Sequence, residues 1–198
     1  MLKLGALWCA WCGLHSLLIT ATVRRWLEQR GGLWLGLYRL VYVGVSMLTL
    51  LPLLWYTASL PQHPLPSPPL WLRGPLLLYA LIMFVGGLRV YDLHAFLGLR
   101  QWRRYRQGES SELPPLNTSG ILGHVRHPWY SGGIALLWGL PNLTTVTLIT
   151  RLILTAYLII GARLEERKMR QLLGAPYRDY CRRTPMFFPW RLGRRDQS

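Results

Sequence analysis

The chain has 198 residues, of which 51% are hydrophobic, and its 23 Lys and Arg against 8 Asp and Glu give a formal net charge of +15. Such an excess of positive charge can indicate nucleic-acid binding, but the apolar runs are too long for a soluble nucleic-acid-binding module, and the charges lie at the ends of those runs. The sequence therefore predicts a membrane protein whose basic residues meet anionic lipid head groups, and no nucleic-acid partner. Its three cysteines cannot form a disulfide framework.

Five apolar segments are candidates for membrane-spanning helices, each of which needs about 20 mostly apolar residues. They are residues 4–23, 34–57, 74–97, 128–142 and 143–163. This pattern predicts an all-α integral membrane protein with about five transmembrane helices. The fourth segment is short and contains Gly132, Gly133 and Gly139, and Pro141-Asn142 separates it from the fifth. We therefore expect these two segments to form a tight antiparallel hairpin whose glycines allow close helix packing.

Basic residues are distributed unequally between the two sets of loops. Most of them follow the first segment, lie between the third and the fourth, or follow the fifth, whereas the opposite loops carry Lys3 and Arg73. Because positively charged loops stay in the cytoplasm, we expect the N-terminus outside and the C-terminus in the cytoplasm, in a bacterial inner membrane. Residues 163–180 place apolar side chains on one side and Arg167 and Arg170 on the other, which predicts a C-terminal amphipathic helix at the membrane interface.

Two polar clusters lie at the ends of the predicted hairpin. The cluster before it is Val125-Arg126-His127-Pro128-Trp129-Tyr130-Ser131-Gly132, and the cluster after it is Glu165-Glu166. Charges so close to hydrocarbon are costly and usually serve a ligand. Because the hairpin returns the chain to the same membrane face, the two clusters should lie close in space. Taken singly, each cluster is more often an interfacial anchor, with Arg126 and His127 on phosphates and the glutamates paired with Arg167 or Lys168.

The chemistry of the two clusters matches the functional groups of S-adenosylmethionine. The ammonium and the ribose hydroxyls of that molecule need carboxylate partners, which Glu165 and Glu166 would supply. Its carboxylate needs a cation, an imidazole or the free N–H groups of a helix start, which Arg126, His127 and the residues behind Pro128 would supply. We therefore expect S-adenosylmethionine as the cofactor, and no metal site.

The order of motifs resembles that of a known superfamily. Arg126-His127-Pro128-x-Tyr130-x-Gly132, an apolar hairpin, Glu165-Glu166 and then Leu173-Gly174-x-x-Tyr177-x-x-Tyr180 resemble the isoprenylcysteine carboxyl methyltransferase and phospholipid methyltransferase superfamily. The N-terminal half is similar to a narrower branch, the methanethiol S-methyltransferases and NnrU-like proteins. The residues that carry this second resemblance are His15-Ser16, Arg24-Arg25-Trp26, Tyr38-Arg39-Leu40-Val41-Tyr42 and Gly98-Leu99-Arg100-Gln101.

The resemblance implies one membrane methyltransferase domain over residues 1–198, with an N-terminal three-helix part at 1–115 and a cofactor-binding hairpin and C-terminal segment at 116–198. It implies a cofactor pocket lined by Val125, Arg126, His127, Pro128, Tyr130, Glu165, Glu166, Tyr177 and Tyr180. That branch usually has a His-x-Asp-Leu-Phe motif before Gly98, whereas here Asp92 precedes His94, so the two side chains are displaced relative to the pattern.

The predicted reaction is S-methylation of a small thiol such as methanethiol. A thiol with an ordinary pKa of about 8.5 needs a base or a nearby cation to lose its proton, so we predict His94, His124 and Arg126 as the catalytic residues. Carboxyl methylation of isoprenylcysteine and N-methylation of a phospholipid are alternatives within the same chemistry. The predicted partners are accordingly a small-molecule or lipid-like methyl acceptor and the membrane lipids.

Two other classes of protein stay open at this point. Five histidines in a helical membrane protein could bind haem or quinone, but haem needs two histidines at matched depth, and His15 lies nearer mid-membrane than His94. We expect His15 to be a hydrogen-bonded packing residue instead. A transporter or assembly factor would leave the adjacent pair Glu165-Glu166 without a reason to lie at the mouth of the hairpin.

Overall fold

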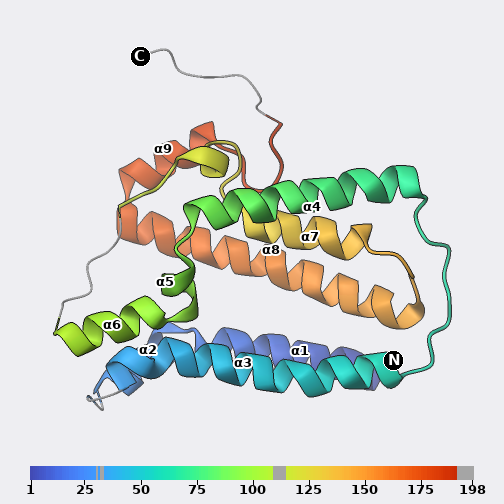
Figure 1. The fold of residues 1–198 in the computed structure, drawn as a ribbon, viewed down its shortest axis with the longest axis horizontal. Helices are drawn as coiled ribbons and strands as arrows, with labels where there is room; N and C mark the ends of the chain where they lie inside the picture. Colours follow the sequence, from blue (N-terminus) through green and yellow to red (C-terminus); the bar gives the residue numbers. More distant parts are fainter. Residues whose placement is uncertain (30, 32–33, 109–114, 191–198) are drawn as a thin grey trace. The chain divides into compact units, whose positions relative to one another are not determined.

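A computed structural model describes residues 1–29, 31, 34–108 and 115–190, and within these ranges all the regular elements are helices (Figure 1). The all-α fold class is thereby confirmed. In chain order they are α1 (Leu2–Leu18), α2 (Ala21–Gln29), α3 (Trp34–Ser59), α4 (Leu70–Val90), α5 (Leu93–Leu97), α6 (Leu99–Gln107), the 3-10 helix η1 (Gly120–Gly123), α7 (Pro128–Gly139), α8 (Thr145–Leu173) and α9 (Ala175–Arg183).

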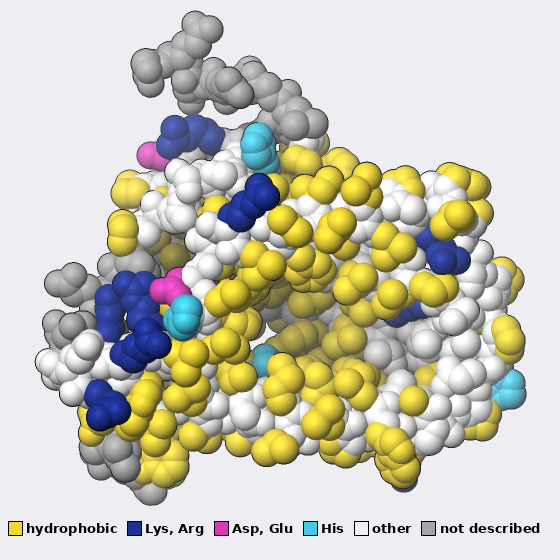
Figure 2. Space-filling model, viewed as in Figure 1, with side chains coloured by type: hydrophobic (Ala, Val, Ile, Leu, Met, Phe, Trp, Pro, Cys, Tyr) yellow, Lys and Arg dark blue, Asp and Glu magenta, His cyan; other side chains and the backbone are white. Residues whose placement is uncertain are grey.

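Three of these helices are long and apolar enough to cross a membrane. They are Gly36–Ser59 within α3, Leu70–Val90, which is α4, and Thr145–Leu173, which is α8. The helix α1 is apolar but has 17 residues, and α7 has 12. Figure 2 shows hydrophobic side chains over much of the visible surface of α3 and α4, whereas dark blue basic side chains gather around α6. These features identify an integral membrane protein.

Two of the predicted segments end earlier than their apolar patterns suggested. The first was expected at 4–23, but α1 ends at Leu18, because the Thr20 hydroxyl donates to Leu17 O at 2.8 Å and accepts from the N–H of Val23 at 3.4 Å. The third was expected at 74–97, but α4 ends at Val90, and Asp92 caps the separate helix α5 by accepting from the N–H of Ala95 at 3.0 Å. Short polar side chains that bond the backbone are good helix N-caps, so each starts a new helix inside an apolar run.

The chain divides into two compact units, the first of which contains Met1–His63, Asp92–Leu113 and Thr144–Ile153. Here α1 and α3 are joined by a row of polar contacts: Trp8 Nε1 donates to Thr57 at 3.1 Å, Trp11 Nε1 donates to Thr49 at 3.2 Å, and His15 meets Ser46 and Tyr42. Along α1 these residues are three or four positions apart, about one helical turn, and their partners on α3 follow in the reverse order, as in an antiparallel pair.

The side chain of His15 is a packing residue in this row, as expected. Its Nδ1 lies 3.0 Å from the Ser46 hydroxyl and its Nε2 faces the Tyr42 hydroxyl. Both ring nitrogens therefore have protein hydroxyls as neighbours, and neither points to an open position where it could ligate haem iron. This geometry disfavours the haem alternative at His15.

The second unit contains Pro64–Tyr91, Pro114–Leu143 and Leu154–Ser198. Small residues let α7 lie very close to its neighbours: a Cβ added to Gly132 would be 3.0 Å from Met83 Cβ on α4, and one added to Gly133 would be 3.2 Å from Leu158 on α8. Trp138 Nε1 also donates to Thr155 at 3.0 Å, which ties α7 to the same stretch of α8. The expected tight hairpin of α7 and α8 is thereby confirmed.

Candidate functional site

The turn before α7 is anchored by its own backbone. Pro128 occupies the first helical position, where its missing N–H costs nothing, and His127 is the N-cap. The N–H of Arg126 donates to Pro185 O at 3.0 Å, and the N–H of His127 donates to Met186 O at 3.1 Å. The segment that follows α9 therefore lies alongside this turn, and it helps to bury Val125 and Pro128, which are among the least exposed residues of the chain.

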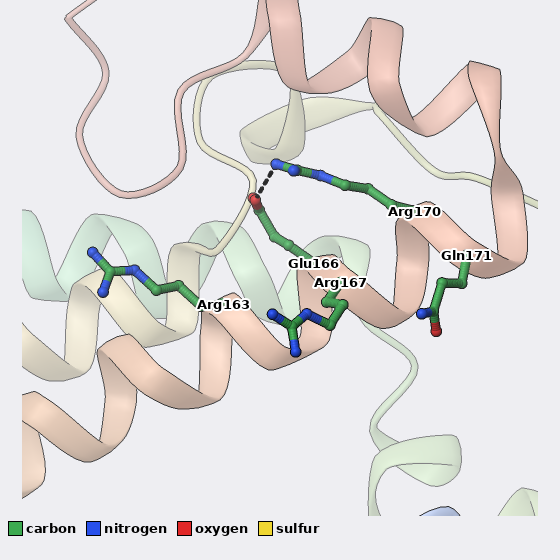
Figure 3. Close-up of a pocket in the computed structure, with 5 residues that line it drawn as sticks. All are labelled: Arg163, Glu166, Arg167, Arg170 and Gln171. Atoms are coloured by element: carbon green, nitrogen blue, oxygen red, sulfur yellow. Dashed lines mark hydrogen bonds and ion pairs between the residues drawn. The ribbon is translucent and has the colours of Figure 1, made fainter.

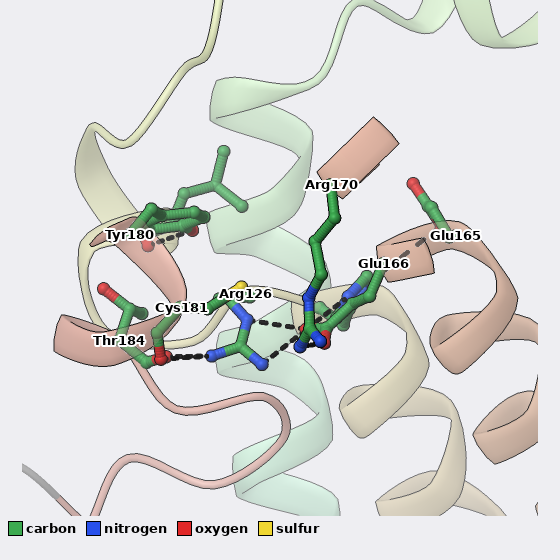
Figure 4. A network of polar contacts seen from close by, with 9 residues as sticks. Arg126, Glu165, Glu166, Arg170, Tyr180, Cys181 and Thr184 are labelled. Atoms are coloured by element: carbon green, nitrogen blue, oxygen red, sulfur yellow. Dashed lines mark hydrogen bonds and ion pairs between the residues drawn. The ribbon is translucent and has the colours of Figure 1, made fainter. Parts of the chain in front are cut away.

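A buried ion pair joins the two clusters that the sequence singled out. Arg126 Nε donates to Glu166 Oε1 at 2.6 Å, and each of the two side chains is only 8% exposed (Figure 4). Arg126 Nη2 also pairs with Glu166 Oε1. The other terminal nitrogen, Nη1, donates to the carbonyls of Cys181, at 3.0 Å, and Thr184. The guanidinium thus fastens α8 and the end of α9 to the turn before α7.

The imidazole of His127 lies between the two glutamates. Its Nε2 is 3.4 Å from Glu166 Oε1 and its Nδ1 is 4.0 Å from Glu165 Oε2, while the side chain itself is 5% exposed. The Tyr130 ring meets the imidazole edge to face, with 5.4 Å between the ring centroids. The structure therefore confirms that the polar residues at the two ends of the hairpin meet in space.

The adjacent glutamates lie in very different surroundings. Glu166 is buried and has three cationic or imidazole neighbours, because Arg170 also donates to its Oε2 at 3.1 Å. Glu165 is 48% exposed, and its side-chain neighbours include His127 and Tyr130. Glu166 is accordingly saturated by the protein, whereas Glu165 keeps acceptor capacity for a ligand.

A pocket of about 400 Å³ opens beside Glu166 on α8 (Figure 3). Its lining residues are Arg163, Glu166, Arg167, Arg170 and Gln171. Residues four apart on a helix lie on the same face, so Arg163, Arg167 and Gln171 form one row of the pocket wall. Three arginines and one saturated carboxylate give the pocket a net positive charge, which suits an anionic group.

The two tyrosines of α9 are both buried, with rings 5.9 Å apart in an edge-to-face arrangement. The Tyr180 O–H donates to Leu122 O in η1 at 2.6 Å. Burial raises the pKa of both Tyr177 and Tyr180 above their ordinary value, so both hydroxyls stay protonated at neutral pH. The phenol of Tyr180 therefore serves as a donor that holds α9 against η1.

The two predicted catalytic imidazoles outside the buried cluster are exposed. His124 directly follows η1 in the second unit and lines an apolar groove with Arg89 and Ile121. His94 belongs to the first unit, where its side chain is 64% exposed and its Nδ1 lies 3.9 Å from Asp92 Oδ1. Their roles, like those of the other predicted site residues, stay predictions.

Sequence reasoning missed three partners of the buried cluster. Arg170 was assigned to the basic side of an amphipathic helix, although its i, i+4 spacing from Glu166 signals an ion pair. The carbonyls of Cys181 and Thr184 had no signal in the sequence, because any residue type supplies a backbone carbonyl.

Comparison with known proteins places these motifs in a family. The model of the NnrU protein family matches residues 3–187. Methanethiol S-methyltransferase 1 of Bradyrhizobium diazoefficiens is 32% identical over 161 residues, which is 77% of this chain and 55% of the relative. Methanethiol S-methyltransferase 2 of the same organism is 31% identical over 189 residues, which is 91% of this chain and 70% of the relative.

A relative with a different name is also similar. Nurim of Sus scrofa is 29% identical over 171 residues, which is 81% of this chain and 64% of that protein. The chain thus spans little more than half of the first methyltransferase and about two thirds of Nurim. No solved structure gave a significant match.

Proposed function

We propose that this chain, which belongs to the NnrU protein family, transfers a methyl group from S-adenosylmethionine to a small thiol such as methanethiol. The family is the one that the sequence motifs indicated. The observation that carries the proposal is the half-exposed carboxylate of Glu165, which precedes Glu166 of the buried Arg126–Glu166 pair in the chain, while Glu166 itself lines a basic pocket. The relatives named methanethiol S-methyltransferase support thiols as the acceptor class.

The residues around the pocket fit a zwitterionic methyl donor. Glu165 would accept hydrogen bonds from the ammonium or the ribose hydroxyls, since its side chain is 48% exposed and it adjoins the pocket residue Glu166 in the chain. Arg163 or Arg167 would pair with the donor's carboxylate. A pocket of about 400 Å³ lies within the size range of small-molecule sites.

Arg126 would act by positioning Glu166 and His127. Its Nε and both Nη atoms donate to Glu166, Cys181 or Thr184, so its donors are largely engaged within the protein. Tyr130, Tyr177 and Tyr180 would supply aromatic walls of the cofactor pocket. All three belong to the second unit, where Tyr130 packs against His127 and the two α9 tyrosines pack against each other. Val125 and Pro128 would set the turn that presents His127.

S-adenosylmethionine supplies, when bound, a methyl group on a positively charged sulfur. The protein would have to align the thiol with that methyl group, exclude water and receive the thiol proton. His124, which is exposed and belongs to the same unit as the pocket, is the proposed proton acceptor, and His94 stays the second candidate on the sequence alone. Substituting each histidine with Asn in turn would distinguish the two.

We also propose that α1 and α7 lie in the membrane with α3, α4 and α8, giving five membrane helices, with α9 at the interface. The apolar composition of α1 and the close packing of α7 on α4 support this arrangement. The distribution of basic residues supports a cytoplasmic C-terminus in a bacterial inner membrane. A reporter enzyme that works only in the periplasm tests this orientation when it is fused to the C-terminus. Activity of that fusion would overturn the cytoplasmic placement.

The purified protein tests the function directly. It would be incubated with methyl-labelled S-adenosylmethionine in three separate reactions, each with one class of acceptor: small alkyl thiols, a prenylated cysteine or phosphatidylethanolamine. We expect label in the thiol product and none in the other two. Label in prenylcysteine or phosphatidylethanolamine alone would replace the acceptor, and no transfer to any acceptor would overturn the proposed activity.

A further inference from the structure

An apolar groove of about 580 Å³ runs along α4 in the second unit, and none of its lining residues lines the proposed donor pocket. Leu81, Val85 and Arg89 lie at four-residue spacing on one line of the helix, and Ile82, Gly86 and Val90 lie on the next line. Both lines contribute to the lining. The groove therefore runs parallel to the helix axis. Leu81 and Ile82 make one end apolar, and Arg89 makes the other end cationic.

The second wall of the groove is held firmly in place by η1. A Cβ on Gly86 would be 2.9 Å from Ile121 Cβ, so the glycine lets η1 lie directly against α4. Val90 and Gly120 also touch, because a Cβ on Gly120 would be 3.1 Å from Val90 Cγ1, and Asn117 Nδ2 donates to Val90 O at 3.5 Å. Packing between α4 and η1 thus fixes the shape of the groove within the unit.

The length of the groove matches one leaflet of a bilayer. The eight residue steps from Leu81 to Arg89 rise by about 12 Å along the helix. The hydrocarbon of one leaflet is about 15 Å thick, half of a core of about 30 Å. Arg89 lies in the last turn of α4, which ends the candidate span Leu70–Val90, so its charge lies at the level of the lipid phosphates.

The cationic end of the groove is open to a ligand. Arg89 and His124 are both exposed, and the described residues supply no hydrogen bond or ion pair to either side chain. A guanidinium binds phosphate well, and an imidazole presents an N–H in either protonation state. The same end carries no acidic lining residue that would compete with a phosphate.

We propose that this groove binds one anionic phospholipid, with an acyl chain along Leu81, Val85 and Ile121 and the phosphate at Arg89. The exposed apolar side chains of Leu81, Ile82 and Val85 supply the contact for the chain, and the positive charge selects anionic head groups. The groove shares His124 with the proposed methyl transfer, but the lipid site is argued from Arg89 and the apolar lining and does not require that activity.

Lipid retention by the purified protein, followed by native mass spectrometry, tests the site. The protein in detergent would be given phosphatidylglycerol or phosphatidylcholine, and we expect preferential retention of phosphatidylglycerol. Arg89→Gln should lower that retention about fivefold, the effect of one basic residue near an anionic surface. Arg89→Lys should keep the preference, and Val85→Trp, which fills the groove, should lower retention of both lipids.

The control is Arg103→Gln, which removes one exposed charge from α6, outside the groove. Unchanged retention in Arg103→Gln, together with the loss in Arg89→Gln, would support the site. Equal losses in the two variants would reduce the effect to general surface charge and overturn the proposal. Full retention by Arg89→Gln and by Val85→Trp would overturn it as well.

Discussion

Arg126 Nε lies 2.6 Å from Glu166 Oε1, although the two residues are 40 positions apart in the chain and both side chains are 8% exposed. The α7–α8 hairpin brings them together, because it returns the chain to the end from which α7 started. A buried pair of this kind is costly to break, since the partner that remains keeps a charge without compensation. The pair thus holds the site and the C-terminal segment in one arrangement.

Breaking this pair should destabilise the protein strongly. We expect Arg126→Met or Glu166→Gln to lower the free energy of unfolding by about 3–5 kcal/mol, because each leaves a buried polar partner unpaired. The double variant should cost clearly less than the sum of the two. Unfolding in mixed micelles, followed by tryptophan fluorescence, measures all three variants.

The exposed pair Asp179–Arg182 supplies the control for that cycle. Its atoms are 3.4 Å apart and its side chains are 56% and 80% exposed. The coupling free energy of an exposed pair is about 0–1 kcal/mol, so a cycle of Asp179→Asn and Arg182→Gln should show near-additivity. A buried cycle as additive as this one would contradict the assignment of Arg126–Glu166 as a stabilising pair.

Donor binding should depend on Glu165 and His127 while the fold does not depend on Glu165. We expect Glu165→Gln to abolish binding of S-adenosylhomocysteine in calorimetric titration, with an unchanged unfolding midpoint, because its side chain is 48% exposed. His127→Phe, which keeps the ring but removes both nitrogens, should also abolish binding. Asp179→Asn, which neutralises another exposed acid, should bind normally, and wild-type affinity in both site variants would refute the assignment.

The sequence alone predicted the meeting of Arg126 and His127 with the two glutamates, because hairpin topology follows from two apolar runs and the Pro141-Asn142 break. It could not separate Glu165 from Glu166. Neighbours on a helix differ by about 100° in direction, and which of them points inward depends on how α8 packs against the turn before α7. The burial of Glu166 therefore required the three-dimensional structure.

The predicted helix boundaries were wrong where a polar side chain bonds the backbone inside or beside an apolar run. Thr20 and Asp92 lie inside or beside apolar runs, and hydropathy gives them little weight, yet each bonds the backbone and ends or starts a helix. The contacts of Arg126 with the carbonyls of Cys181 and Thr184 were also beyond prediction. They depend on the path of the chain after α9, which no periodic pattern specifies.

Close packing of α4 on α7 should tolerate no side chain at Gly87. A Cβ there would lie 2.1 Å from Trp129 Nε1, so Gly87→Ala must displace an indole whose N–H donates to Phe84 O at 3.3 Å. We expect a loss of about 1–3 kcal/mol in unfolding free energy, as is typical of overpacking. Gly44→Ala in α3 is the control, because a Cβ at Gly44 would have no atom within 4 Å, and that variant should be neutral or more stable.

The hydroxyl of Tyr180 should contribute to stability in a pH-dependent manner. Tyr180→Phe removes the donor to Leu122 O, which is buried with η1, and should cost about 1–3 kcal/mol in unfolding free energy. Tyr56→Phe is the control, since the Tyr56 hydroxyl makes no hydrogen bond among the described residues, and this variant should change stability little.

Burial raises the pKa of Tyr180 above its ordinary value of 10.0, so the folded protein holds this proton more tightly than the unfolded chain does. The contribution is therefore complete below pH 10 and is lost as the pH rises above 10, because the unfolded chain then releases the proton first. Wild-type stability should fall more steeply above pH 10 than that of Tyr180→Phe. Parallel curves for the two proteins would show that the phenol is not buried as a neutral donor.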